Sequence, residues 1–434
     1  ARYFVLPSGR EPPADSPYDN PWQARPADYL RRDFELRNPV RQALVHVSAL
    51  GVYELRLNGR RVGDDVMAPG WTDYHQRVPY QVHDVTGLLT TGDNAIGAIL
   101  GEGWYCGRVG ANRRKAGMHY GGRPALICQL EIVFEDGTRT RIVSDDAWRT
   151  SHGPIFYSDF LVGERYDARA EMPGWDAPGF DDAGWQPVEA FVPEPRPPRL
   201  DAERCPPVRE IMELPAGLVG ETADGRLIFN VGQNLAGYVR LDVTGDIPAG
   251  AAFTLRHGER LDEDGSLYVT NLRSAPSTDV FIARGGRPES FKPHFTFHGF
   301  QYVELTLPQG VSRDAVRLTA IALHNDLPVT GDFACGNELV DRLAGNIMWS
   351  QRGNFLSVPT DCPQRDERLG WLADAQVFWR TAGYNMDVSA FLAKWMVDIG
   401  DAQLADGAFT DIAPSKPLNP YRVTAQPGAP GWGD

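Results

Sequence analysis

Seven residues near the end of the sequence combine acidic, basic and aromatic side chains that could carry out acid–base chemistry. They are Asp361, Arg365, Asp366, Glu367, Arg368, Trp371 and Asp374. A helix that continues from Glu367 would place Trp371 and Asp374 on its own face, because residues three or four apart are neighbours on a helix. A carboxyl group beside an aromatic ring and other carboxylates favours its protonated form, since burial and like charge both penalise ionisation. A protonated Glu367 could donate to a leaving oxygen, as the general acid of a glycosidase does opposite a second carboxylate.

The same residues also fit an ordinary helix start. Arg365 and Arg368 could form ion pairs with Asp366 and Glu367 at a solvated helix N-terminus, where the helix dipole favours acidic side chains. Residue types and spacing favour this structural interpretation slightly over an active site, and both stay open at this point.

The elements expected along the chain change from strands to helices. Residues 29–192 alternate in short apolar and polar runs between turn pairs, among which Asn58-Gly59 predicts a hairpin, and this pattern is typical of a β-sandwich. A proline-rich linker at residues 192–207 interrupts the strands, and residues 208–323 then predict a second sandwich. After it, apolar residues recur at helical spacing, with Asn337 as the candidate N-cap of the first helix.

These patterns divide the chain into four parts. We predict an N-terminal extension over residues 1–27, a jelly-roll-like β-sandwich over 28–200, a second sandwich over 201–330 and the beginning of a helical domain over 331–434. A chain of 434 residues is too long for one ordinary hydrophobic core, which agrees with several domains.

Composition narrows the kinds of partner. The 57 acidic and 43 basic side chains give a formal net charge of −14, which disfavours nucleic acid and anionic membranes and suits a neutral partner. Aromatic residues make up 10% of the chain, and flat rings suit the apolar faces of sugars. Five scattered cysteines predict reduced thiols rather than disulfides. We therefore expect a soluble protein of the cytoplasm, with a periplasmic or secreted location left open because an N-terminal signal could have been removed.

The segment Asp361-Cys-Pro-Gln-Arg-Asp-Glu-Arg-Leu-Gly-Trp371, followed by Asp374, closely resembles the active-site signature of the bacterial and fungal α-L-rhamnosidases, glycoside hydrolase family 78. The resemblance implies that Glu367 is the general acid. It also implies that the rhamnose pocket is lined by Asp361, Arg365, Asp366, Trp371 and Asp374. The family often has Thr-Gly where this chain has Leu372 and Ala373, two positions without a chemical role.

The resemblance extends over nearly the whole chain. Segments that look like the family's two sandwiches include residues 48–59, 101–105, 229–237 and 295–300. Trp432 and Asp434 resemble a Trp-Gly-Asp motif that borders the pocket, and by the same resemblance the helices begin an (α/α)6 toroid, the catalytic domain. About a hundred residues are too few for a toroid of paired helices. We therefore expect the catalytic domain to be incomplete, with its catalytic base outside this chain.

Two segments invite a metal site. Residues 163–169 are similar to a segment that in some relatives belongs to a calcium-assisted rhamnose-binding module, but the preceding Asp159 has no second polar neighbour, whereas calcium needs several oxygen ligands. His294 and His298 lie four residues apart on one expected strand face and lack a third ligand. We therefore expect no cofactor, with calcium as the weaker alternative, and interpret these residues as structural.

The expected fold is thus multidomain, with two β-sandwiches followed by the first helices of an α/α toroid. The expected function is an inverting glycosidase that releases terminal α-L-rhamnose from glycosides or polysaccharides, with a homodimer left open. Two alternatives are another carbohydrate enzyme on the same toroid, a lyase or a phosphorylase, and a carbohydrate-binding protein without activity. Product analysis separates the enzymes, because a lyase leaves an unsaturated sugar and a phosphorylase requires phosphate.

Overall fold

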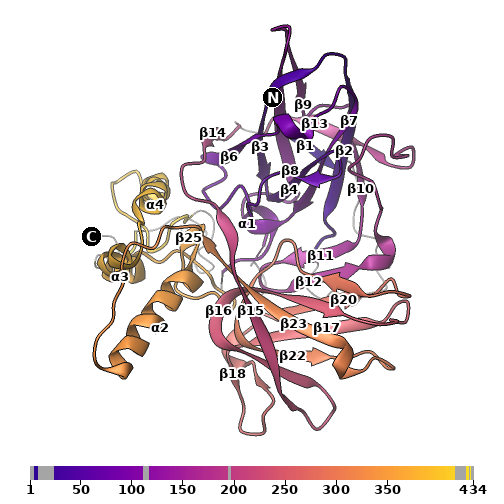
Figure 1. The fold of residues 1–434 in the computed structure, drawn as a ribbon. Helices are drawn as coiled ribbons and strands as arrows, with labels where there is room; N and C mark the ends of the chain where they lie inside the picture. The colour runs from indigo at the N-terminus through magenta and orange to yellow at the C-terminus, as the bar shows by residue number, and fades with distance from the viewer. Residues whose placement is uncertain are drawn as a thin grey trace. The chain divides into compact units, whose positions relative to one another are not determined.

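The computed structural model describes residues 4–7, 24–110, 117–193, 197–415, 427–429 and 431. The chain forms two compact units (Figure 1). Unit 1 comprises residues 1–107, 120–158 and 170–203, and unit 2 comprises residues 108–119, 159–169 and 204–434. Unit 2 therefore holds the segment with the candidate catalytic residues together with a large part of the β structure.

Unit 1 is built almost entirely from β-strands. Its strands are β1 (Phe4–Pro7), β2 (Asp28–Leu36), β3 (Val40–Leu50), β4 (Val52–Leu57), β5 (Arg60–Arg61), β6 (Arg77–Asp84), β7 (Gly92–Gly101), β8 (Ala125–Phe134), β9 (Arg139–Val143), β10 (Arg149–His152), β13 (Gln186–Phe191) and β14 (Arg199–Ala202). They follow the order β14-β6-β3-β8-β1-β13-β10-β2-β7-β4-β5, and β9 pairs with β8. The single helical turn α1 (Gly103–Cys106) and the strand β11 (Ile155–Asp159) fall at the ends of its chain segments.

The core of unit 1 follows the alternation of its strands. Val45 and Val47 on β3 and Leu130 on β8 are buried in one cluster, because every second side chain of a strand points to the same face. Trp148 is fully buried in the same core. The hairpin predicted at Asn58-Gly59 is confirmed, since both residues have positive φ and join β4 to β5 in register.

Unit 2 contains a second sheet. Its strands are β12 (Gly163–Asp167), β15 (Val208–Glu221), β16 (Leu227–Val243), β17 (Ala252–Gly258), β20 (Thr278–Ile282), β21 (Glu289–Phe291), β22 (His298–Thr306) and β23 (Val316–Asn325), with a small hairpin of β18 (Arg260–Leu261) and β19 (Leu267–Tyr268). From β12 onward the order is β12-β20-β17-β22-β16-β15-β23, β21 pairs with β16, and β16 also pairs with β23.

The long strand β16 changes partner at Gly237. This residue is paired with His298 of β22 and with Ala322 of β23. A Cβ atom at Gly237 would lie 1.9 Å from the carbonyl oxygen of Ile321, so only glycine allows the strands to approach this closely. The strand thereby joins two parts of the sheet around a core that includes Phe253, Phe281 and Phe300, as a sandwich-like arrangement requires.

The helices of unit 2 follow the sheet in the chain. They are α2 (Glu338–Asn354), α3 (Leu372–Asn385) and α4 (Ser389–Ala402), with the two-stranded hairpin of β24 (Phe355–Leu356) and β25 (Val358–Pro359) between the first two. The predicted N-cap is confirmed, because the Asn337 side chain accepts from the backbone N–H of Leu339. None of the described helices combines the length and apolar composition needed to cross a membrane.

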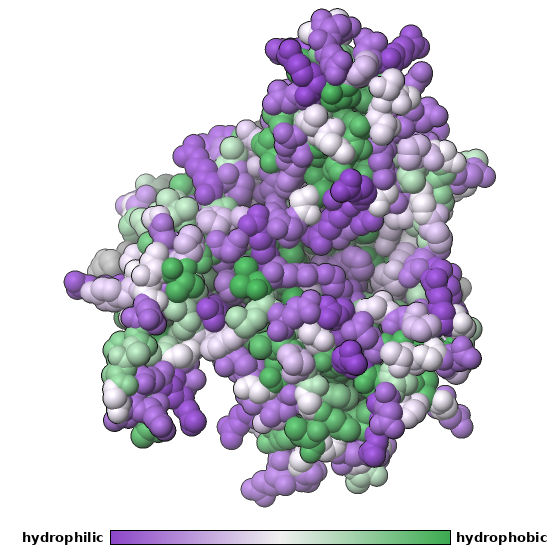
Figure 2. All heavy atoms as spheres, viewed as in Figure 1, coloured by the Kyte–Doolittle hydropathy of each residue, from purple (hydrophilic) through white to green (hydrophobic). Residues whose placement is uncertain are grey.

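The helical spacing of apolar residues predicted α2 but not which of them would be buried. Leu339 and Leu343 are 74% and 57% exposed, and Val377 of α3 is 78% exposed. Figure 2 shows apolar side chains at the surface in the region where Figure 1 places these helices. Phe391 and Trp395 of α4, by contrast, are buried.

Candidate active site

The segment with the candidate catalytic residues is not helical. Residues 360–370 contain no helix, and α3 begins only at Leu372, with Trp371 as its N-cap. The condition that a helix continues from Glu367, on which the shared face with Trp371 and Asp374 depended, is therefore not met. The physical reason lies next to Glu367, where Arg368 has φ +62°, a left-handed backbone conformation that an α-helix of L-residues excludes.

Glu367 nevertheless contacts the predicted tryptophan. Its carboxyl is buried, with 4% of the residue exposed. The indole Nε1 of Trp371 donates a hydrogen bond to Oε1 of Glu367. The thiol of Cys362 lies 3.0 Å from Oε2, and the backbone N–H of Arg368 donates to the same oxygen over 3.1 Å. Both carboxyl oxygens are thus held by hydrogen-bond donors in a site largely closed to water.

Asp361 is the charged neighbour of Glu367. One carboxyl oxygen from each residue and the sulfur of Cys362 lie within 4.8 Å of one another. Burial, followed by interaction with the Asp361 carboxyl, raises the pKa of Glu367 to about 8. Both effects favour the protonated form. Burial also raises the pKa of the Cys362 thiol, so the protonated thiol can donate to Oε2 of Glu367.

The arginines of the segment do not form the ion pairs of a solvated helix start. Arg365 donates to Oδ2 of Asp361 over 2.9 Å. The guanidinium of Arg368 is buried and donates to the backbone carbonyl of Phe297 over 2.8 Å. The alternative of a solvated, salt-bridged helix N-terminus is therefore wrong, because the segment is neither helical nor solvated.

The remaining predicted site residues, Asp366, Asp374, Trp432 and Asp434, differ in burial and in whether the structure describes them. Asp366 is buried, accepts a hydrogen bond from Ser274 and lies 3.6 Å from a guanidinium nitrogen of Arg273. Asp374 is exposed in the first turn of α3, where partial burial and then Asp361 raise its pKa. Trp432 and Asp434 lie outside the described residues.

Several contacts of this site could not be found from the sequence. Ser274 and Phe297 come from loops of the β structure, far from Glu367 in the chain. Residues 295–300 had stood out only as a motif of the second sandwich, and no spacing rule relates a strand end to a loop about seventy positions later. Cys362 lay inside the recognised signature, but its contact with Glu367 depends on the irregular path of the backbone.

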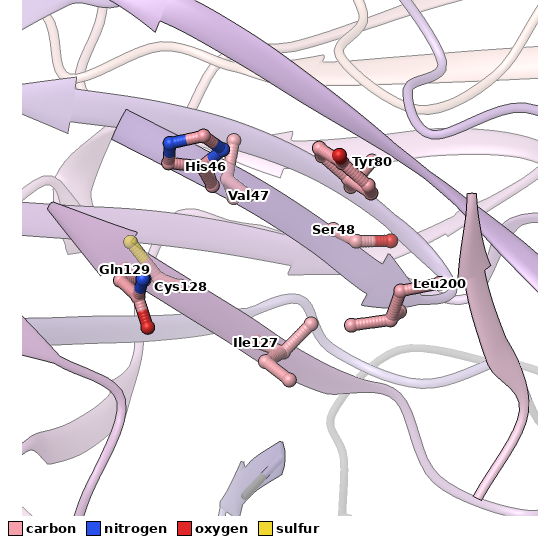
Figure 3. A pocket seen from close by; sticks show the side chains of 8 residues that line it. All are labelled: His46, Val47, Ser48, Tyr80, Ile127, Cys128, Gln129 and Leu200. Atoms are coloured by element: carbon pink, nitrogen blue, oxygen red, sulfur yellow. The ribbon is translucent and has the colours of Figure 1, made fainter. Parts of the chain in front are cut away.

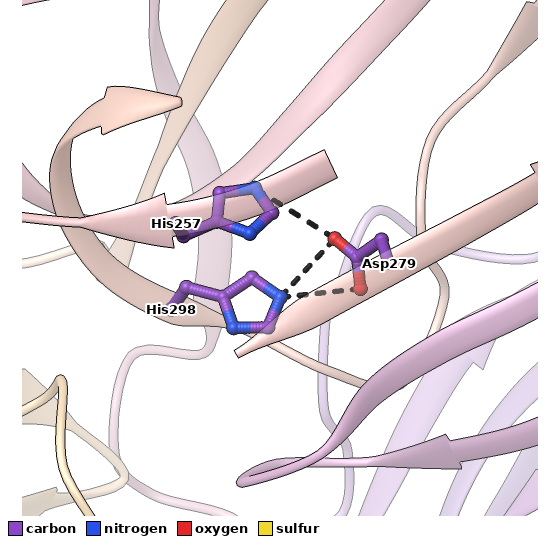
Figure 4. A group of neighbouring side chains, drawn as sticks. All are labelled: His257, Asp279 and His298. Carbon is purple, nitrogen blue, oxygen red and sulfur yellow. Dashed lines mark hydrogen bonds and ion pairs between the residues drawn. The ribbon is translucent and has the colours of Figure 1, made fainter. Parts of the chain in front are cut away.

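The two histidines predicted to share a strand face have different partners. His294 precedes β22 and lies 3.0 Å from Glu164. His298 begins β22, and its Nε2 lies 3.1 and 3.2 Å from the two carboxyl oxygens of Asp279. His257, from β17, stacks on His298 with ring centroids 4.1 Å apart (Figure 4). The buried group is therefore His257, Asp279 and His298, of which the sequence analysis singled out only one member.

This buried group suits hydrogen bonding better than metal binding. Burial lowers the pKa of His257 to about 3 and raises that of Asp279 to about 7, which favours uncharged forms. The group supplies three ligand atoms within 4.8 Å. However, Nδ1 of His298 has no hydrogen-bond partner among the described residues, whereas a metal-bound histidine normally donates from its second nitrogen. We interpret the group as a polar part of the core.

The weaker expectation of calcium concerned the segment after Asp159. The carboxyl of Asp159 accepts backbone N–H bonds from Leu161 and Val162 through Oδ1 and from Arg108 through Oδ2, over 2.7–3.1 Å. These donors use the oxygens that a calcium ion would need. The arrangement gives Asp159 a structural role in closing the turn before β12.

The pockets of the described residues include one in each unit. One, in unit 2, has a volume of about 370 Å³ and adjoins the acidic segment; its lining includes Asn234, Glu259, Trp349, Asn354, Asp361 and Gln364. The other, in unit 1, has about 170 Å³ and is lined by strand residues such as His46, Tyr80, Gln129 and Leu200 (Figure 3). No carboxylate lines the second pocket, whereas Glu259 and Asp361 line the first.

Comparison with known families gives a consistent match along the chain. Residues 38–212 match the alpha-L-rhamnosidase N-terminal domain, residues 220–324 the bacterial alpha-L-rhamnosidase concanavalin-like domain, and residues 328–434 the bacterial alpha-L-rhamnosidase 6 hairpin glycosidase domain. The three matched segments follow the order expected from the resemblance.

Individual relatives agree with these matches. An alpha-L-rhamnosidase of Streptomyces avermitilis is 48% identical over 417 residues, which is 95% of this chain and 39% of that protein. One of Formosa agariphila is 39% identical over 410 residues, 94% of this chain and 43% of that protein. The chain thus spans about two fifths of the length of these relatives.

Solved structures show the same similarity. The Streptomyces avermitilis alpha-L-rhamnosidase complexed with L-rhamnose matches with a TM-score of 0.86 at 48% identity, covering 90% of this chain and 38% of that one. The native enzyme from Aspergillus terreus matches with a TM-score of 0.89 at 37% identity, covering 100% of this chain and 48% of that one.

Proposed function

Because the chain belongs to the bacterial α-L-rhamnosidase family, we propose that the protein hydrolyses terminal α-linked L-rhamnose in glycosides or polysaccharides, with Glu367 as general acid. Its relatives are named for this activity, and one of them was solved with L-rhamnose. The observation that carries the assignment of the acid is the buried Glu367 carboxyl with its pKa of about 8. Such a group is protonated at neutral pH and can donate to the glycosidic oxygen.

The hydrogen bonds of Glu367 suit both halves of the proton transfer. Burial and Asp361 favour the protonated acid before the transfer. The donors from Trp371, Cys362 and the Arg368 backbone face the two oxygens and stabilise the carboxylate that remains after it. Preorganised donors of this kind act where negative charge develops, so they lower the barrier rather than only binding the substrate.

We propose that hydrolysis is a single displacement with inversion. An inverting glycosidase separates its two carboxyl groups by about 6.5–9.5 Å, to leave room for the attacking water. Asp361 is too close for that role, because its nearest oxygen lies within 4.8 Å of Glu367. The base is then a carboxylate other than Asp361.

Asp361 has features of a sugar-binding residue instead. Its Oδ2 accepts from Arg365, while Oδ1 is buried and has no hydrogen-bond partner among the described residues. The protonated Glu367 also forms a side-chain hydrogen bond with Asp361. Because a carboxyl oxygen accepts more than one hydrogen bond, a hydroxyl group of rhamnose would bind to the acceptor capacity that remains. We therefore propose that Asp361, Arg365 and Trp371 contact the sugar. Asp366 instead stabilises the segment by accepting the hydrogen bond from Ser274. Contacts from Asp374, Trp432 and Asp434 remain predictions.

Replacement of Glu367 by glutamine tests the proposal. The variant Glu367→Gln keeps the shape and hydrogen-bonding capacity of the side chain but cannot donate a proton to the leaving oxygen. In the intact protein we expect release of rhamnose from a natural glycoside to fall by at least about a hundredfold, with unchanged circular dichroism. The exposed Glu263 provides the matched control, and Glu263→Gln should retain parental activity.

The product distinguishes the proposed mechanism from its rivals. Proton NMR during turnover by the parent protein should first show the anomer of free rhamnose opposite in configuration to the bond cleaved. Near-parental activity of Glu367→Gln would reject the acid, and first release of the retained anomer would reject inversion.

A further inference from the structure

The position of the Glu367 carboxyl depends on a segment without regular secondary structure. Residues 360–370 contain neither helix nor long strand, so no repeating backbone hydrogen bonds fix the acid. Catalytic groups need placement within a fraction of an ångström, and a displacement of about 1 Å can cost about a hundredfold in rate. Isolated backbone hydrogen bonds do reach the segment, from the N–H of Gly110 to the carbonyl of Glu367 over 2.8 Å and from the N–H of Asp366 to the carbonyl of Leu272 over 3.4 Å. Contacts of side chains must complete the placement of the acid.

Arg368, the residue after Glu367, makes an unusual set of contacts. Its guanidinium is almost completely buried, with 2% of the residue exposed. It donates to the backbone carbonyl of Phe297 over 2.8 Å, and its central carbon lies 4.6 Å from the centre of the Phe297 ring. Longer bonds reach the carbonyls of Arg365 and Gln364, at 3.4 and 3.5 Å. The planar guanidinium of Arg368 thus connects residues 360–370 to Phe297, the residue directly before the sandwich strand β22.

These contacts are energetically demanding. Burial lowers the pKa of Arg368 to about 10, so the group still carries its charge at neutral pH. Among the described residues no carboxylate lies within ion-pair distance of this guanidinium. The Asp159 carboxylate raises the pKa of Arg368 without offsetting the effect of burial, and burying a cation that is only partly compensated is costly. Its backbone is also left-handed, with φ +62°, which costs roughly 1–2 kcal/mol for a residue other than glycine. Strain of this kind is concentrated at functional sites.

The left-handed conformation lets the backbone and the side chain of Arg368 make contacts in two different directions. Its backbone N–H donates to Oε2 of Glu367 over 3.1 Å, while its side chain enters the sandwich. The same face of the segment is held at two further points. Asp366 accepts from Ser274, and Gln364 packs on Gly299, where a Cβ atom would come within 2.7 Å of the Gln364 Cβ.

We propose that Arg368 is a positioning residue for the general acid. The start of β22, with Gly299 and the preceding Phe297, is the surface on which the segment that carries the acid packs. The inference rests on the proposed role of Glu367. In this arrangement the second sandwich is part of the catalytic apparatus rather than a spacer. Gln364, Asp366 and Arg368 face the sandwich, while the intervening Glu367 is turned toward Trp371 and Asp361.

The test compares two rhamnosides that differ in their need for a proton. An alkyl rhamnoside has a poor leaving group and depends on the acid, whereas a nitrophenyl rhamnoside leaves without full protonation. For Arg368→Met we expect kcat on the alkyl rhamnoside to fall about ten- to a hundredfold, with a KM within about twofold and a much smaller fall on the nitrophenyl rhamnoside. Arg368→Lys keeps the charge but loses the planar donors, and should lie between this variant and the parent.

A control variant tests whether replacing any buried arginine lowers the activity, and a second variant covers the case that Arg368→Met does not fold. Arg352 of α2 also stacks on an aromatic ring, that of Trp349, and burial also lowers its pKa; Arg352→Lys should retain parental activity on both rhamnosides. Gly299→Ala keeps the Arg368 side chain and pushes on Gln364, whose carbonyl accepts from Arg368. It should reproduce the selective loss if Arg368→Met fails to fold by circular dichroism.

The outcomes separate this inference from the proposed function. If Glu367→Gln loses the alkyl rhamnoside selectively while Arg368→Met and Gly299→Ala affect both rhamnosides equally or neither, Glu367 is the acid and the positioning role is wrong. If Glu367→Gln itself shows no selective loss, the proposed acid is wrong and the inference fails with it.

Discussion

At the scale of single residues, the proposed role of Glu367 as general acid depends on what surrounds its carboxyl group. Glu367 is buried, shares its site with Asp361 and accepts hydrogen bonds through both oxygens. Burial is the largest cause of its raised pKa, and Asp361 is the next. The environment rather than the residue type therefore decides that this glutamate carries a proton at neutral pH.

The raised pKa predicts the alkaline limit of the activity. With the pKa of Glu367 near 8, kcat/KM should fall as the pH rises through about 8, because the acid then loses its proton. Asp361→Asn removes the charge that penalises ionisation, so its alkaline limit should move to lower pH even though sugar binding is also weakened. A pH–rate profile of both proteins checks this, and an unchanged limit in the variant would contradict the coupling.

The same shift predicts a cost in stability. The pKa of Glu367 is higher in the folded chain than its ordinary value of 4.5, so the folded state is favoured at low pH and loses that advantage as the pH rises from about 4.5 to about 8. Glu367→Gln cannot ionise and should be more stable than the parent at pH 8, by up to a few kcal/mol, with the difference shrinking toward pH 4.5. Thermal unfolding at both pH values measures this; a variant less stable than the parent at pH 8 would refute it.

At the scale of elements, the acid segment lies between the β24–β25 hairpin and α3. The sequence predicted the helices after residue 332, the Asn58-Gly59 hairpin and the N-cap at Asn337, because all three depend on neighbouring residues. It did not predict the irregular path from residue 360 to 370, because the left-handed Arg368 is stabilised by Phe297, a residue far away in the chain. Local propensity cannot anticipate a contact of that kind.

The residues that line the site were predictable only through the recognised signature. Spacing alone favoured a salt-bridged helix start, which assumed a solvent-exposed segment. Burial of Glu367 and the contact of Arg365 with Asp361 depend on packing against the sandwich. Ser274 and Gly299, which touch the segment from the sandwich side, carry no signal of this role in their own neighbourhoods.

The start of α2 allows a test of element stability. Asn337 accepts from the backbone N–H of Leu339 at the helix N-terminus, a bond that Asn337→Ala removes. Loss of such a cap costs about 1 kcal/mol, so the variant should melt a few degrees lower, while Asn337→Asp keeps an acceptor and should match the parent. Differential scanning fluorimetry is sufficient for the comparison, and equal melting of all three proteins would show that the cap contributes nothing.

At the scale of the whole molecule, the chain divides into two compact units, and the candidate acid with all its described contacts belongs to unit 2. Each unit has its own hydrophobic cluster, one around Trp148 and Leu130 and the other around Phe253 and Phe300. Separate cores predict separate unfolding.

A core substitution in unit 1 tests this division. Leu130 is fully buried in the cluster of unit 1, and Leu130→Ala should destabilise that unit by about 2–5 kcal/mol through lost packing. Scanning calorimetry should then show one transition at lower temperature and the other unchanged. A common shift of all transitions would mean that the two units unfold together.

The central claim is that Glu367 donates the proton to the departing oxygen, and the dependence on the leaving group tests it most directly. We predict that Glu367→Gln in the intact protein lowers kcat on an alkyl rhamnoside by about a hundred- to ten-thousandfold. On a nitrophenyl rhamnoside, whose leaving group needs little protonation, the same variant should keep most of its activity. Equal losses on both substrates, or no loss on either, would contradict the assignment.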